Sequence, residues 1–218
     1  MVLGWYVSTF MVGSLAIVTG AGSISQEVEN GTILGLASSP LSRRSIVLGK
    51  YTAYALVSSL YSTVLLISIM ALSGYFCRLI FEPYGVAAAV VVFTLFPLAL
   101  LAVTMALSAI FTTMSAGIIA FMIFVVSIIG GFVEQIGALM GNGALINIGI
   151  VSSLIMPSDA VYRLAVDLAS RTMAHSSIVD FGPFGTASTP STLMLVYTIV
   201  YLGIWLTTAV HNFEKRDL

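Results

Sequence analysis

Long apolar runs alternate with short polar stretches along the chain. Residues 1–26 and 51–77 contain no Asp, Glu, Lys or Arg, and the uncharged run 83–133 is long enough for two helices. A membrane-spanning helix needs roughly 20 largely apolar residues. The pattern therefore predicts an all-α membrane protein with about five spans and a tight turn at 112–115. The predicted spans cover about 2–22, 51–77, 84–111, 115–133 and 192–210.

The segment between the last two predicted spans, 135–190, has a different pattern. Its first part, 135–157, is uncharged, but four glycines and two asparagines interrupt it. Backbone polar groups that face lipid are costly. We therefore expect this part to lie at the membrane interface or to re-enter the membrane partway. A full sixth span is the alternative.

Residues 158–171 follow a helical pattern with two distinct faces. Charged residues recur at intervals of four: Asp159, Arg163, Asp167 and Arg171. Apolar residues fall on the other face: Val161, Leu164, Ala165 and Leu168. This spacing stacks opposite charges on one side of a helix. It predicts an outer amphipathic helix that lies along the membrane surface with its charged face in water.

Composition agrees with a membrane location. Hydrophobic residues make up 59% of the chain and charged residues 8%, whereas soluble domains carry about 25% charge. The net charge of −1 gives no reason to expect a nucleic-acid partner. The single Cys77 excludes an internal disulfide. The first apolar run has no preceding Lys or Arg, so we do not expect a secretory signal peptide.

The basic residues predict an orientation. Arg43, Arg44 and Lys50 lie before the second predicted span, and Lys215 and Arg216 follow the last one. Four spans separate the two groups, so both can lie on the cytoplasmic side, as the positive-inside rule favours. The basic residues of the other side each have an acid four residues away: Arg78, Arg163 and Arg171. We expect a multi-pass cell-membrane protein with a cytoplasmic C-terminus and an outer N-terminus.

Residues typical of catalysis or metal binding are sparse. The predicted spans hold no ionisable group except at their ends, where Glu134 closes the fourth span and is interpreted as an interfacial acid rather than a proton carrier. His175 and His211 have no second ligand at metal-binding spacing. The Gly49–Lys50 pair lacks the glycine and hydroxyl residue that a phosphate-binding loop needs around it. The sequence predicts no catalytic residue, no metal site and no cofactor bound by this chain.

The polar stretch 23–50 is unusual for so apolar a chain. Ser23 and Gln26 have the spacing of a capping box, which predicts the start of a short helix. Asn30–Gly31 is a turn signal, Thr32 can cap a further helical turn, and Pro40 ends that turn. We therefore expect a compact folded elbow rather than a loose tether.

The residue order of this stretch resembles the permease subunits of the type-2 ABC exporter family. The pattern is Glu-x-x-Asn-Gly-Thr, then Pro-Leu-Ser-Arg, then Leu-Gly-Lys. The matching residues are Glu27, Gly31, Thr32, Pro40, Ser42, Arg43, Gly49 and Lys50. Residues 156–163 look like the outer segment of the family, and 213–218 look like its usual ending. In that family the corresponding stretch forms a coupling helix that docks into the nucleotide-binding subunit.

The resemblance implies a single permease domain over 1–218 that forms a substrate path with a second permease copy or paralogue. ATP and Mg would bind to a separate ATP-binding subunit, so this chain would not be an enzyme. The residues implied in coupling are Glu27, Glu29, Gly31, Thr32, Pro40, Arg43, Arg44 and Lys50. The two acids would pair with the arginines of the elbow or with basic groups of the ATPase.

Family members have six spans with the N-terminus inside, so five spans imply that the first is missing or is supplied by a partner. Two rival functions are an ion-coupled secondary transporter and a non-transporting membrane scaffold. The absence of ionisable groups within the predicted spans disfavours the first rival.

Overall fold

The computed structural model describes residues 2–31, 42–77, 82–171 and 188–215, so Thr32 and Pro40 lie outside the described residues. The elements in these ranges are helices. They are α1 (Val2–Ala21), α2 (Ser25–Glu29), α4 (Arg43–Cys77), α5 (Pro83–Ser108), α6 (Thr113–Met140), α7 (Gly143–Ile155), α8 (Ser158–Arg171) and α9 (Leu193–Lys215). Five segments, α1 with α2, α4, α5, α6 and α9, are long and apolar enough to cross a membrane. This confirms the predicted all-α integral membrane class.

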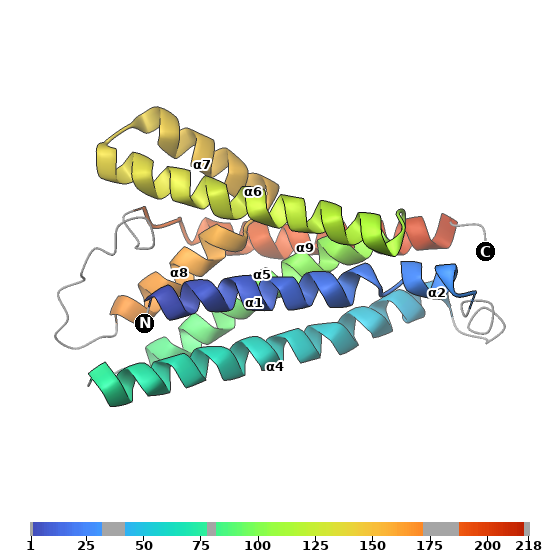
Figure 1. Cartoon of the computed structure of the whole chain (residues 1–218), viewed down its shortest axis with the longest axis horizontal. Helices are drawn as coiled ribbons and strands as arrows, with labels where there is room; N and C mark the ends of the chain where they lie inside the picture. The colour runs from blue at the N-terminus through green and yellow to red at the C-terminus, as the bar shows by residue number, and fades with distance from the viewer. Residues whose placement is uncertain (1, 32–41, 78–81, 172–187, 216–218) are drawn as a thin grey trace.

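Helix α5 lies at the centre of the bundle and contacts α1, α4, α6, α8 and α9. It is apolar on every side, and residues 99–108 are buried without interruption. A helix that is hydrophobic all round is stable only when other helices cover it. Figure 1 shows α1, α4 and α6 running along the long axis, with α5 crossing behind α1.

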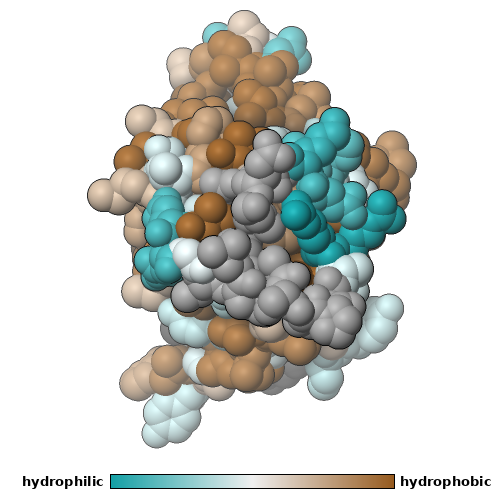
Figure 2. All heavy atoms as spheres, turned by 90° about the vertical axis from the view of Figure 1, so that its right-hand side faces the viewer, coloured by the Kyte–Doolittle hydropathy of each residue, from teal (hydrophilic) through white to brown (hydrophobic). Residues whose placement is uncertain are grey.

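The two ends of the bundle differ. One end carries α2, the start of α4 and the end of α9, and we call it the elbow end (Figure 1). The other, the far end, carries the start of α1 and the connection between α6 and α7. Figure 2 looks onto the elbow end and shows hydrophilic side chains gathered on an otherwise largely hydrophobic surface.

Helices α6 and α7 form a tightly packed hairpin. Gly141, with φ +66°, ends α6, and the Asn142 side chain accepts a hydrogen bond from the Ala144 N–H of α7 (3.0 Å). Glycine brings the two helices into close contact, because a Cβ at Gly149 would lie 2.2 Å from Cβ of Glu134. Helix α6 thus continues past Glu134, which lies inside the helix rather than at the end of a span.

Helices α7 and α8 meet at a bend of 105°. In Figure 1, α7 runs from the far end toward the middle of the molecule, and α8 runs back toward the far end. This arrangement agrees with a segment that re-enters partway. The bent pair also fits the alternative of a full sixth span, if the two helices together form one broken span.

The prediction of a wet, surface-bound outer helix is wrong. The charged residues Asp159, Arg163 and Asp167 are 6%, 1% and 9% exposed, and Leu164 on the other face is 5% exposed. The bundle covers both faces of α8. Two of these charged residues, Asp159 and Arg163, can be buried because they are paired, as described below. Leu168 is partly buried against the core, and the Arg171 side chain lies outside the described set.

Helix α4 begins eight residues before the predicted second span, so Arg43, Arg44 and Lys50 lie on its first turns rather than in a loop. Ser42 starts the helix by accepting a hydrogen bond from the Ser45 N–H (3.2 Å).

The predicted cap of α2 is not formed. Ser23 donates instead to the Gly20 carbonyl (2.6 Å), and α2 starts at Ser25 without a side-chain cap.

The α6–α7 hairpin gives a testable prediction about glycine. We expect Gly149→Ala to lower the free energy of unfolding by roughly 1–3 kcal/mol, because the new methyl group overlaps the backbone and Cβ of Glu134. Gly203→Ala in α9 is the matched control, since no atom lies within 4 Å of its Cβ position. Thermal unfolding in detergent measures both. Equal melting temperatures for the two variants would contradict the close packing.

Candidate functional site: the polar elbow and the buried charge cluster

The polar elbow consists of the described residues in 23–31 and 42–50. Its helix α2 is fixed to the end of α5 through one hydroxyl group. Ser108 Oγ accepts hydrogen bonds from the Ile24 N–H (3.2 Å) and the Ser25 N–H (3.0 Å). The same hydroxyl donates to the Ala21 carbonyl (2.8 Å). The backbone between α1 and α2 therefore cannot move without α5.

A second contact fixes the elbow to α6. The Glu29 carboxylate accepts from the Thr113 N–H at one oxygen (2.8 Å) and from the Thr113 hydroxyl at the other (3.1 Å). The Ser25 hydroxyl also lies 2.8 Å from the Thr113 hydroxyl. Thr113 is the first residue of α6. A carboxylate at a helix N-terminus satisfies a free N–H and is stabilised by the helix dipole.

A third contact, within the elbow, joins α2 to α4. Glu27 forms an ion pair with Lys50, whose ammonium group also donates to the Ser23 carbonyl (2.7 Å). Arg44 pairs instead with Glu214 of α9, at 2.6 Å. Of the two expected pairings of the elbow acids, the one with Arg43 and Arg44 is not among the ion pairs of the described residues, and the one with an ATPase stays a prediction.

Arg43 connects α4 to the end of α9. Its guanidinium donates to the backbone carbonyls of Glu214 (3.0 Å) and Phe213 (3.4 Å). The last carbonyls of a helix lack partners within it, so a cation there is favourable. The elbow end is in this way a continuous polar assembly of α2, α4, α5, α6 and α9.

One face of the elbow points away from the bundle. Gln26, Glu29, Asn30 and Gly31 are exposed. Gly31 has φ +69° and no atom within 4 Å of its Cβ position, which fits the predicted Asn30–Gly31 turn.

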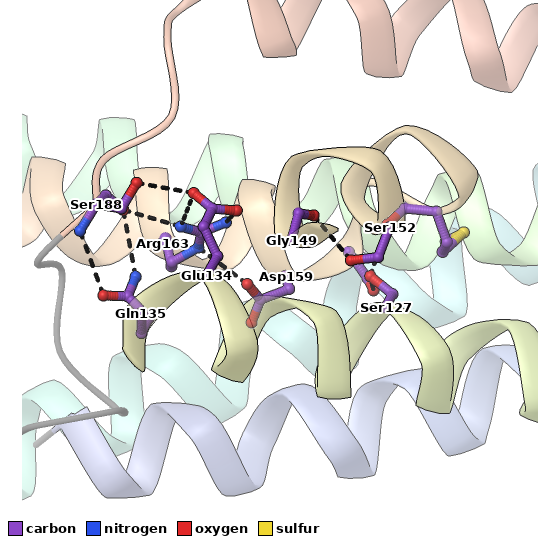
Figure 3. Close-up of polar contacts among 10 residues, drawn as sticks. Ser127, Glu134, Gln135, Gly149, Ser152, Asp159, Arg163 and Ser188 are labelled. Carbon is purple, nitrogen blue, oxygen red and sulfur yellow. Dashed lines mark hydrogen bonds and ion pairs between the residues drawn. The ribbon is translucent and has the colours of Figure 1, made fainter. Parts of the chain in front are cut away.

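Toward the far end, three charged side chains form a buried cluster (Figure 3). Arg163 of α8 donates through its two terminal nitrogens to the two oxygens of Glu134 of α6, both at 2.7 Å. Its Nε lies 2.9 Å from the Asp159 carboxylate, one turn earlier in α8. The side chains of Glu134, Asp159 and Arg163 are 5%, 6% and 2% exposed. Buried ions need such pairing, because an isolated one is strongly destabilising.

Four hydrogen bonds hold Ser188, just before α9, against this cluster. Its N–H donates to Gln135 Oε1 (3.3 Å), and its carbonyl accepts from Gln135 Nε2 (3.2 Å) and Arg163 (2.9 Å). Its hydroxyl donates to Glu134 (2.8 Å). We call this group the Ser188 clamp. It attaches the start of the last helix to α6 and α8 (Figure 3).

The clamp forms one wall of a cavity of about 360 Å³. The cavity is lined by Glu134, Arg163 and residues 188–191 on one side, and by α7 residues such as Ile150 and Ser153 on the other. Ser153 is 5% exposed, and its hydroxyl has no hydrogen-bond partner among the described residues.

The arrangement can bind and position groups through its hydrogen bonds and ion pairs. Among the residues that the structure describes, no group of three or more His, Cys, Asp or Glu side chains could hold a metal ion. Sequence reasoning found the four-residue spacing of Asp159 and Arg163 but missed the roles of Glu134, Gln135 and Ser188. No local signal identifies these partners, because 29 positions separate Glu134 from Arg163.

Comparison with known proteins identifies a family for the chain. A family model described as an ABC-2 family transporter protein matches residues 7–218. No curated protein matches the chain.

Two arginines give a prediction that separates buried from exposed ion pairs. We expect Arg163→Gln to destabilise the fold by roughly 3–5 kcal/mol, because Glu134 would remain buried without the cation that pairs with both of its oxygens. Arg44→Gln should change stability little, since the Arg44 side chain is 70% exposed. Chemical denaturation in detergent measures both. If Arg163→Gln is as mild as Arg44→Gln, the cluster is not buried as described.

Proposed function

The chain belongs to the ABC-2 transporter family, a family of membrane permeases, and we propose that it forms the substrate path of an exporter driven by a separate ATP-binding subunit. In this proposal α2 is the coupling helix, ATP and Mg bind to the partner, and this chain carries out no chemistry. A second permease, a copy or a paralogue, completes the path across the cell membrane.

The observation that carries the proposal is the attachment of the polar elbow. Ser108, Thr113 and Lys50 connect its short helix to α5, α6 and α4 respectively. A push on the exposed face of α2 would therefore reach three membrane helices through hydrogen bonds and an ion pair.

The need for a second permease is supported by an apolar groove of about 860 Å³ between α1 and α6. Its lining includes Ile17, Val18, Ile118 and Phe121. A second permease placed against this side would enclose the groove. Its apolar lining suits a lipid-like, hydrophobic or peptide cargo.

The buried charge cluster removes the argument from the sequence against an ion-coupled transporter. Glu134 and Arg163 are ionisable groups inside the bundle, so the shortage of such groups no longer argues against an ion-coupled transporter. Membership of the ABC-2 family is what favours ATP-driven transport. A non-transporting scaffold stays the second rival.

The basic residues predict that the elbow end faces the cytoplasm. In cells carrying Cys77→Ala, a cysteine at Ser42 should be shielded from an impermeant thiol reagent, whereas a cysteine at Gly143 should react. Both positions are exposed and lie toward opposite ends of the bundle. Labelling of Ser42→Cys from outside would reverse the orientation.

The proposed coupling predicts a specific charge swap. Glu27→Lys and Lys50→Glu should each lower the ATP hydrolysis that the permease stimulates in a co-purified ATP-binding subunit after reconstitution into vesicles. The double swap should restore part of it, since the ion pair re-forms while the bond from Lys50 to the Ser23 carbonyl does not.

The matched control combines Glu27→Lys with Arg43→Glu. It should give no rescue, because Arg43 contacts the carbonyls at the end of α9. An ATP-binding subunit that fails to co-purify in mild detergent would contradict the proposal and favour one of the rivals. Equal rescue by both double variants would contradict the Glu27–Lys50 contact as the link to α4.

A further inference from the structure

The charges of the buried cluster do not balance. Glu134 and Asp159 are two acids, and Arg163 is the one cation that contacts them among the described residues. If both acids are ionised, one net negative charge is buried with side-chain exposures of 6% or less. A buried charge without a counter-ion is strongly unfavourable, and such a group neutralises instead.

We propose that Asp159 binds a proton and that this proton keeps the Ser188 clamp closed. A hydronium ion of the solvent donates the proton: one of its O–H bonds breaks, an O–H bond forms on the Asp159 carboxylate, and a water molecule and a neutral carboxylic acid result. The cluster then contains one anion, Glu134, and one cation, Arg163. The proposal concerns this chain alone and holds with or without an ATP-binding partner.

Geometry places the proton on Asp159 rather than on Glu134. Glu134 receives Arg163 through both oxygens at 2.7 Å, the two-pronged arrangement that suits a carboxylate and a guanidinium. Asp159 has one contact with Arg163, at 2.9 Å to Nε. Its carboxyl group packs against Gly131, where a Cβ would lie 1.9 Å from Oδ2. The Asp159 carboxyl group therefore has less free space around it than the Glu134 carboxyl group, and its negative charge would be less well neutralised by Arg163.

Among the described residues, the groups around Asp159 supply no second cation. Helix α1 contributes Tyr6, α6 contributes Glu134, and α8 contributes Tyr162 and Arg163. Asp167 lies two turns further along α8. Helices α5 and α7 contain no charged residue, and the charged residues of α9 lie at the elbow end.

The proton controls the clamp because Arg163 serves both carboxylates. While Asp159 is neutral, Arg163 is held by Glu134, and together they bind the hydroxyl and carbonyl of Ser188. When Asp159 is ionised, it competes for the guanidinium and repels Glu134. The clamp loses its partners, and the wall of the cavity formed by residues 188–191 is free to move away from Ser153.

Infrared spectroscopy of the purified protein tests the proton itself. The difference spectrum between about pH 5 and about pH 8 should contain the carbonyl band of a protonated, buried carboxylic acid. Asp159→Asn should lose this band, and Glu214→Gln, which changes an acid at the elbow end, should keep it. A band that persists in Asp159→Asn, or that only Glu134→Gln removes, would overturn the assignment.

Thiol accessibility tests the link to the clamp. In a Cys77→Ala background, Ser153→Cys places a thiol on the cavity wall, and Gly143→Cys provides an exposed reference for the intrinsic effect of pH on thiol reactivity. The labelling rate at 153 relative to 143 should rise severalfold from about pH 5 to about pH 8. Asp159→Asn should abolish this rise, and Glu134→Gln should leave 153 reactive throughout. The same rise with and without Asp159 would refute control of the clamp by this proton.

Discussion

The guanidinium of Arg163 is the interaction on which the far end of the molecule depends. It contacts Glu134 of α6, Asp159 of its own helix and the Ser188 carbonyl before α9. A charged residue inside an apolar bundle is stable only with partners, and here the partners come from three separate segments. The requirement to pair Arg163 therefore fixes how α6, α8 and the start of α9 meet.

At the elbow end, the groups that need partners are backbone groups at helix ends rather than charged side chains. Helix termini carry backbone N–H and carbonyl groups that the helix itself cannot pair. Glu29 pairs those at the start of α6, and Arg43 pairs those at the end of α9. The elbow end is therefore connected by side chains from one helix that complete the backbone of another. Such contacts transmit displacement better than apolar packing, because they have a defined direction and distance.

The sequence predicted the class of fold because span length and the absence of charge are local properties. Five apolar helices and the position of the elbow followed from them. The burial of α8 could not be predicted in this way. The spacing of Asp159 and Arg163 alone predicts a face exposed to water. Only the structure shows that Glu134 of α6 pairs with Arg163 on this face. The pairing of Glu27 with Lys50 could not be predicted either, because Arg43 and Arg44 are equally plausible partners by their distance along the chain. Partners distant in sequence are set by packing, which no local pattern records.

The length of α4 has a consequence for the surrounding bilayer. Its 35 residues extend over about 52 Å, whereas the hydrocarbon core is about 30 Å thick. A straight helix of this length must tilt or project, and its tilt depends on the thickness of the lipid around it. Near one end of the helix, Arg43 contacts the end of α9 and Lys50 pairs with Glu27 of α2. A change in bilayer thickness that tilts α4 would therefore shift α2 and the end of α9 together, and membrane composition would act on the elbow through α4.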